Sequence, residues 1–254
     1  MLHPTKGRIK RALARLANRG AGLGSTPDRS SATFDARRYF RGDHGLRFYN
    51  VGTQPMRHLA RSIYAANRVE WTVDEAMALA DELIIDPNLE TKAVGIEVVG
   101  RFRRSFTPKL LRQWKRWLAA NHSANWATTD AICGALIGPL LVDYPRCAVT
   151  MKTWSQHPNL WVRRASIVGL IPLVRKGGGL DLAYEIAATL HRDRADLIQK
   201  AVGWTLREAG KIDAARLERY LRAQGGAIPR TTLRYAIERF PEAKRRALLS
   251  VTRP

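Results

Sequence analysis

The sequence contains few cysteines and no long apolar stretch. Cys133 and Cys147 are the two cysteines in 254 residues, and their spacing fits neither a zinc finger nor a redox motif. The longest nearly apolar run, residues 131–142, is shorter than the roughly 18 residues that a membrane-spanning helix needs. Residues 1–20 are basic but lack the apolar segment of a secretory signal. We therefore expect a cytoplasmic protein with reduced, structural thiols and no membrane association.

Common motifs for metal, phosphate and nucleophilic chemistry are also missing. The six histidines form no cluster with the spacing of a metal site. A glycine-rich phosphate loop is absent, and no Ser-His-Asp arrangement can be assigned. The sequence therefore predicts neither a metal nor a cofactor.

Acidic residues are scarce compared with basic ones. The chain has 43 Lys and Arg against 22 Asp and Glu, a formal net charge of +21 and a pI near 11.0. Because 45% of the residues are hydrophobic, this excess belongs to a folded protein with a polyanionic partner rather than to a disordered tail. Charge alone leaves DNA, ribosomal RNA and anionic lipid open as that partner.

Strand alternation is not found, and the N-terminal residues show helical periodicity. Residues 7–18 predict a basic amphipathic helix, and the Gly- and Ser-rich segment 21–33 predicts a flexible link that would leave this helix loosely held. We accordingly divide the chain into residues 1–35, the basic helix with its link, and residues 36–254, a single helical domain.

Two further helices have clear start signals. Thr72 and Glu75 have the spacing of a capping box, for a helix that ends before residues 86–88. Thr107 and Pro108 begin another helix. Its apolar face would carry Leu111, Trp114 and Leu118.

Self-similarity gives the architecture. A basic residue followed by Ala recurs at Lys92-Ala93, Arg164-Ala165 and Lys200-Ala201, which are 72 and then 36 residues apart, and Arg234-Tyr235-Ala236 follows after 35 more. A period near 36 with two helices per unit is typical of HEAT-like repeats. We therefore predict an all-α solenoid of stacked antiparallel helix pairs with a basic concave face. Lys92, Arg164 and Lys200 would form a row along one surface that follows DNA phosphates.

Three segments extend this to a resemblance with a known family: NWATTDAI at 125–132, NLWVRRASIVGL at 159–170 and IQKAVGWTLRE at 198–208. Together they resemble the AlkD-type DNA alkylation repair glycosylases, which have HEAT-like repeats. A weaker similarity covers residues 36–59. The resemblance departs from the family pattern at residues 50–55 and at Pro172, where a basic residue is expected.

The resemblance implies a function and a set of site residues. The implied reaction is hydrolysis of the N-glycosidic bond of cationic N3- or N7-alkylated purines in double-stranded DNA, by a monomer. The implied catalytic residues are the carboxylate Asp130 and the cleft aromatics Trp126 and Trp204. Expected DNA contacts come from six residues: Arg164, Arg163, Lys200, Arg207, Tyr39 and Lys92.

Other interpretations of these residues stay open. Trp126 and Asp130 are four residues apart, which places them on one helix face, but a Trp in a helical repeat is more often core and a lone Asp is more often solvated. Trp154 and Trp161 are expected to be packing residues. A DNA-binding solenoid without catalysis and a protein-interaction scaffold are the alternatives to an enzyme.

Overall fold

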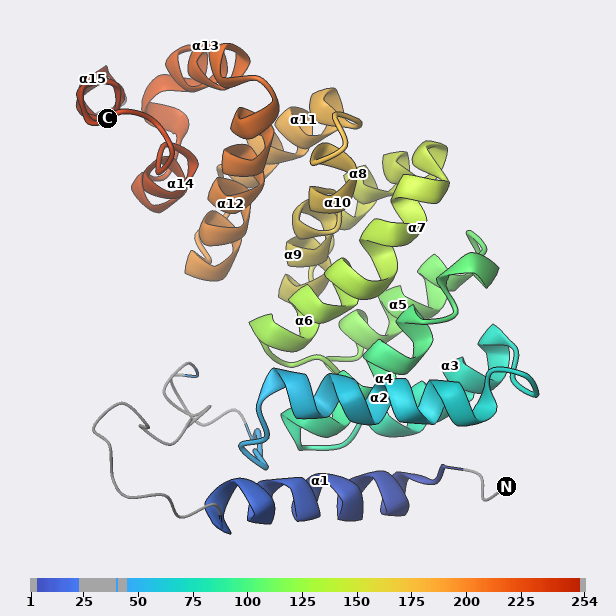
Figure 1. Cartoon of the computed structure of the whole chain (residues 1–254). Coiled ribbons are helices and arrows are strands. Elements are labelled where there is room, and N and C mark those ends of the chain that lie inside the picture. The colour runs from blue at the N-terminus through green and yellow to red at the C-terminus, as the bar shows by residue number, and fades with distance from the viewer. Residues whose placement is uncertain (1–3, 23–39, 41–44, 252–254) are drawn as a thin grey trace. The chain divides into compact units, whose positions relative to one another are not determined.

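The described part of the chain is helical. The computed structural model describes residues 4–22, 40 and 45–251 (Figure 1). Within them there is no strand, only an isolated bridge between Arg47 and Asn88, which confirms the prediction of an all-α fold. The α-helices are α1 Lys6–Gly22, α2 Thr53–Asn67, α3 Val73–Ile84, α4 Leu89–Gly100, α5 Leu110–Ala119, α6 Trp126–Ile132, α7 Gly138–Asp143, α8 Thr150–Ser155, α9 Leu160–Val168, α10 Ile171–Val174, α11 Leu180–Leu190, α12 Asp196–Ile212, α13 Ala214–Gln224, α14 Arg230–Ala236 and α15 Glu242–Val251. Short helical turns are 3₁₀ at Arg103–Ser105, Pro145–Val149 and Gly225–Ala227 and π-helical at Cys133–Ile137.

These helices belong to two compact units. The first unit comprises Met1–Phe106 and His122–Thr128, and the second comprises Thr107–Asn121 and Thr129–Pro254. Helix α6 contributes residues to both. The continuous solenoid and its concave face stay predictions, as does the domain boundary at residue 35, which lies outside the described residues.

In the first unit, α3 packs along α4, and α4 packs along α2 (Figure 1). The predicted capping box of α3 is confirmed, because Thr72 and Glu75 make both of its reciprocal hydrogen bonds. Gly95 of α4 allows the close approach, since a Cβ atom there would lie 3.2 Å from the Leu83 Cβ and 3.3 Å from the Ala80 Cα.

Helix α1 is part of the first unit. Ile9 and Leu13 are buried, and the ammonium groups of Lys6 and Lys10 lie 3.4 and 3.0 Å from the carboxylate of Asp86, which is 1% exposed. Contrary to the expectation of a loosely held helix, α1 therefore has both an apolar and an ionic contact with its unit. Most of the link expected at 21–33 lies outside the described residues.

In the second unit, α9 packs against α5, α8 and α12, and α12 packs against α14. The predicted apolar face of α5 is confirmed, because Leu111, Trp114 and Leu118 are all buried. Trp154 is a core residue, as expected, whereas Trp161 is half-buried. None of the helices described is both long and apolar enough to cross a bilayer.

Three of the four repeated basic residues occupy the same place in their helices. Lys92 is the fourth residue of α4, and Arg164, Lys200 and Arg234 are each the fifth residue of α9, α12 and α14. Arg164, Lys200 and Arg234 therefore share one position in their helices, and Lys92 is one residue earlier.

Candidate active site

The turn that leads into α6 is built by one asparagine. Asn125, 3% exposed, accepts a hydrogen bond from the Thr128 backbone N–H at 2.8 Å, as an N-cap does. Its Nδ2 donates to the Ser123 carbonyl and to the Thr128 hydroxyl. Trp126 is thereby fixed as the first residue of α6, and Asp130 follows one helical turn later. The helix then continues into the π-helical turn, a feature often found at functional sites.

Asp130 is held by a single arginine within the second unit. Arg164 of α9 donates from Nε to Oδ1 at 2.8 Å and from Nη2 to Oδ2 at 2.7 Å, a bidentate pair. Its remaining Nη1 donates to the Leu197 carbonyl in the first turn of α12. The Arg164 side chain is 7% exposed and that of Asp130 is 17% exposed, so the carboxylate keeps access to solvent.

Two opposing effects act on the Asp130 carboxyl. Burial raises its pKa above the ordinary value for aspartate, because a low-polarity environment disfavours the charged form. The hydrogen bonds and the positive charge of Arg164 lower the pKa and so oppose that rise. Arg164 therefore orients the carboxylate and also favours its ionised form.

Trp204 lies in the middle of α12 and is half-buried. Lys200 lies one turn before it and Arg207 one turn after it, on roughly the same helix face. Both cations already have acidic neighbours: Lys200 is 2.7 Å from Asp196, and Arg207 pairs with Glu238. Both side chains are partly exposed.

Arg163 points to a different set of partners from its neighbour Arg164. It donates from Nε to Asp193 at 2.7 Å and from Nη1 to the carbonyls of His157 and Pro158. The structure therefore places Arg163 in a second Arg–Asp pair, separate from the one that holds Asp130.

The predicted exposed row of cations is wrong for two of its three members. Lys92 and Arg164 are each 5% exposed, and only Lys200 reaches the surface. In the first unit, the Lys92 ammonium donates to the Ile84 carbonyl at 2.5 Å and to the His122 carbonyl at 2.6 Å. It thus ties the end of α3 to the turn that precedes α6. Burial lowers the pKa of Lys92 to about 8.

One aromatic contact at Trp126 was missed by sequence reasoning. Tyr39, the predicted DNA contact, lies outside the described residues, but the next residue, Phe40, stacks on the Trp126 indole with ring centroids 5.4 Å apart. Both residues belong to the first unit. The sequence has two adjacent aromatic residues here, Tyr39 and Phe40, but it does not indicate that Phe40 contacts Trp126.

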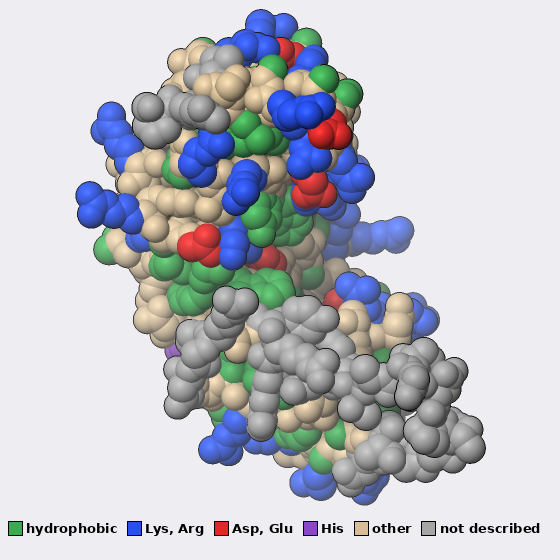
Figure 2. All heavy atoms as spheres, turned by 90° about the vertical axis from the view of Figure 1, so that its left-hand side faces the viewer, with side chains coloured by type: hydrophobic (Ala, Val, Ile, Leu, Met, Phe, Trp, Pro, Cys, Tyr) green, Lys and Arg blue, Asp and Glu red, His purple; other side chains and the backbone are tan. Residues whose placement is uncertain are grey.

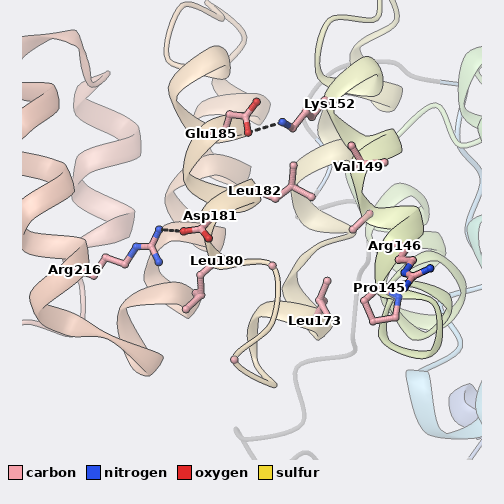
Figure 3. Close-up of a pocket in the computed structure, with 13 residues that line it drawn as sticks. Pro145, Arg146, Val149, Lys152, Leu173, Leu180, Asp181, Leu182, Glu185 and Arg216 are labelled. Carbon is pink, nitrogen blue, oxygen red and sulfur yellow. Dashed lines mark hydrogen bonds and ion pairs between the residues drawn. The ribbon is translucent and has the colours of Figure 1, made fainter.

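A cavity of about 590 Å³ in the second unit lies apart from these residues. Its wall includes Val149, Leu173 and Leu182, with two ion pairs at its edge, Lys152–Glu185 and Arg216–Asp181 (Figure 3). None of the predicted site residues lines it. Its two carboxylates, Glu185 and Asp181, are both engaged in these ion pairs, so the candidate site lies at Asp130 instead.

The surface view adds the electrostatic setting. Figure 2 shows many Lys and Arg side chains and few Asp and Glu on one face of the protein, mainly in its upper part. In the described part of the chain, no group of three or more His, Cys, Asp or Glu could hold a metal ion. The candidate active site is centred on the Asp130 carboxylate and the Arg164 guanidinium that holds it with two hydrogen bonds.

Comparisons with known proteins identify the family of the chain. A structure described as "Predicted DNA alkylation repair enzyme from Enterococcus faecalis" is similar in fold, with a TM-score of 0.68 and 16% sequence identity, over 78% of this chain and 91% of that chain. Curated proteins gave no significant match. The family model for DNA alkylation repair enzymes matches residues 27–240, and the chain therefore belongs to the DNA alkylation repair enzyme family.

Proposed function

We propose that this protein is a DNA glycosylase that hydrolyses the N-glycosidic bond of cationic N3- or N7-alkylated purines in duplex DNA. The observation that carries the proposal is the Asp130 carboxylate, oriented by two hydrogen bonds from Arg164 and still 17% exposed. Membership of a DNA alkylation repair family supports the substrate class. Monomeric action and a cytoplasmic location are part of the proposal.

The chemistry asks little of the protein. The alkylated purine already carries a positive charge, so when the C1′–N bond breaks its electron pair neutralises the base, which leaves without an added proton. The deoxyribose becomes an oxocarbenium-like cation, and the oxygen of a water then bonds to C1′ and releases a proton. The protein has to stabilise the sugar cation and orient the water.

Asp130 has the geometry for both tasks. Arg164 occupies two of the roughly four lone-pair positions of the carboxylate, which leaves positions for a cation or a water. Opposite unit charges about 4 Å apart attract by about 4 kcal/mol at an effective dielectric constant of about 20. If that attraction acts mainly in the transition state, it accelerates the reaction about a thousandfold.

Asp130→Asn tests the proposal. The change keeps the size of the side chain but removes its charge, so release of base from a duplex containing N7-methylguanine should fall about 100- to 1000-fold. DNA affinity should stay the same or increase, because a negative charge near phosphates is lost. Single-turnover base release and equilibrium DNA binding measure the two effects.

Asp193→Asn is the matched control, because Asp193 forms another largely buried Arg–Asp pair, at 2.7 Å from Arg163, with a side chain 12% exposed. It should leave the rate of base release almost unchanged. An undiminished rate in Asp130→Asn contradicts the mechanism. Wild-type protein that binds duplex DNA but releases no base would instead be a non-catalytic DNA-binding protein, and absence of DNA binding would favour a scaffold.

The two tryptophans should have smaller effects. Trp126→Ala and Trp204→Ala each remove one aromatic face that can lie against a cation, rather than a full charge, so base release should slow less than in Asp130→Asn. Both rings are half-buried. Truncation of a core Trp costs about 3–5 kcal/mol of stability, so thermal melts of the two variants separate a packing role from a role in the site.

A further inference from the structure

Three aromatic rings, those of Phe48, Phe40 and Trp126, contact one another in series in the first unit. The centroids of Phe48 and Phe40 are 5.3 Å apart, and those of Phe40 and Trp126 are 5.4 Å apart. The Phe40 and Trp126 planes differ by 18°, which is a stacked arrangement, whereas Phe48 is tilted by 38° from Phe40. Phe40 therefore lies between the indole and a second phenyl ring.

At the Phe48 end of this series, the chain is hydrogen-bonded to the start of α4. Arg47, next to Phe48, donates from its backbone N–H to the Pro87 carbonyl at 2.9 Å and accepts from the Leu89 N–H at 2.9 Å. On the other side, Glu90, 5% exposed, accepts from the backbone N–H groups of Tyr49 and Val51 at 3.1 and 3.3 Å. The backbone on both sides of Phe48 is thus fixed by hydrogen bonds.

At the other end of the series, the cap fixes the backbone of Trp126 and leaves its ring orientation to packing. The Asn125 cap sets where Trp126 begins α6, yet a cap places the Cα atom and leaves the side-chain dihedral angles to packing. Phe40 covers one face of the indole. The orientation of the ring therefore depends on the side chain stacked on it.

Ring orientation matters for the chemistry. The attraction between a cation and an indole acts over the ring face, within about 6 Å of the centroid, so a rotated ring stabilises a cation less well. We propose, on the basis of the proposed function, that Phe40 is a positioning residue for Trp126. Supported by Phe48, it holds the indole from one face, so that the remaining ring surface is presented to the cationic alkylpurine nucleotide.

Phe40→Leu in the full-length protein tests this assignment. Leucine keeps an apolar side chain but cannot stack, and single-turnover base release from an N7-methylguanine duplex should slow about three- to tenfold, with DNA affinity unchanged. Phe40→Tyr retains the ring and should stay within about twofold of the wild type. In a Trp126→Leu background, Phe40→Leu should have no further effect, because the ring that it positions is gone.

Tyr64→Leu is the matched control. Tyr64 packs edge-on against Phe102 in the same unit, with centroids 5.0 Å apart, so its replacement removes an aromatic contact that does not involve Trp126. Its rate of base release should equal that of the wild type. Thermal melts of all variants show whether any loss of rate follows from unfolding.

A spectroscopic measurement tests the role of Phe40 independently of the proposed function. The contribution of Trp126 to the near-ultraviolet circular dichroism is the difference between a protein with Trp126 and the same protein with Trp126→Phe. This difference should change in the Phe40→Leu background and be retained in the Phe40→Tyr background. Wild-type protein that releases no base overturns the proposed function, and the spectrum then still decides whether Phe40 orients the indole. An unchanged difference spectrum, or additive rate losses in the double variant, overturns the assignment of Phe40.

Discussion

Arg164 connects two helices of the second unit through one side chain. Its guanidinium holds both Asp130 oxygens and also donates to the Leu197 carbonyl, so its position is fixed from two sides. Breaking a buried pair of this kind leaves an uncompensated charge. The loss of Arg164 should therefore affect the ionisation of Asp130 as well as its orientation.

Arg164→Leu should move the acid limb of the pH–rate profile to higher pH. Burial already raises the pKa of Asp130, and the variant removes the hydrogen bonds and positive charge that oppose that rise. The carboxylate would then remain protonated up to a higher pH, and base release would be lost earlier as the pH falls. Arg164→Lys, which keeps the charge but not the bidentate geometry, should give a smaller shift.

The measurement is the single-turnover rate from about pH 5 to about pH 8. Arg175→Leu serves as the control, because Arg175 pairs with Glu208 rather than with Asp130. An acid limb at the same pH in Arg164→Leu and in the wild type would show that Arg164 does not act on the ionisation of Asp130.

At the scale of the elements, α7 follows the π-helical turn and packs against α10. A Cβ atom on Gly138 would lie 2.3 and 2.7 Å from Pro172 Cγ and Cδ and 2.9 Å from the Cys133 carbonyl oxygen. Pro172, the departure from the family pattern noted in the sequence, is the second residue of α10 and packs on this glycine. Its place is therefore explained by helix packing.

Gly138→Ala should destabilise the protein by about 1–3 kcal/mol, because the added methyl group cannot be accommodated without moving α7 or α10. The control is Gly134→Ala, four residues earlier, where a Cβ atom meets nothing within 4 Å. That change should be neutral or slightly stabilising, since alanine restricts the unfolded chain more than glycine does. Urea unfolding measures both, and equal stabilities would contradict the packing argument.

Sequence reasoning succeeded for features that are local in the chain. The capping box at Thr72 and the apolar face of α5 depend on residues a few positions apart, and both are confirmed. The partners of Lys92 and Arg164 could not be predicted in this way. Lys92 meets the Ile84 and His122 carbonyls, and Arg164 meets Asp130 and the Leu197 carbonyl, only when separate helices pack. The pattern of charges in the sequence alone therefore suggested an exposed row.

At the scale of the whole molecule, the net charge of +21 should make DNA binding depend strongly on salt. If the protein neutralises about six to ten phosphates, the logarithm of the affinity should fall with the logarithm of the salt concentration at a slope of about −5 to −9. Undamaged duplexes of different sequence should bind about equally, because phosphate contacts carry no sequence information. Fluorescence anisotropy titrations at several salt concentrations measure the slope.

Two lysines at equivalent places in the repeat provide matched variants for that titration. Lys200→Gln removes a partly exposed charge and should reduce the slope by about 1, whereas Lys92→Met removes a buried ammonium and should leave the slope unchanged. A slope near zero for the wild type would contradict DNA binding through phosphates and would favour an acidic protein partner.

The closely similar positions of Lys92, Arg164, Lys200 and Arg234 in their helices have an evolutionary consequence. If these repeats descend from one duplicated ancestor, each copy inherited a cation at the fourth or fifth residue of its helix. In α9 that cation faces a carboxylate on another helix, whereas in α4 it holds two backbone carbonyls. A carboxylate could then come to pair with an inherited arginine by a single substitution, while Lys92 continued to hold backbone carbonyls and Lys200 stayed partly exposed.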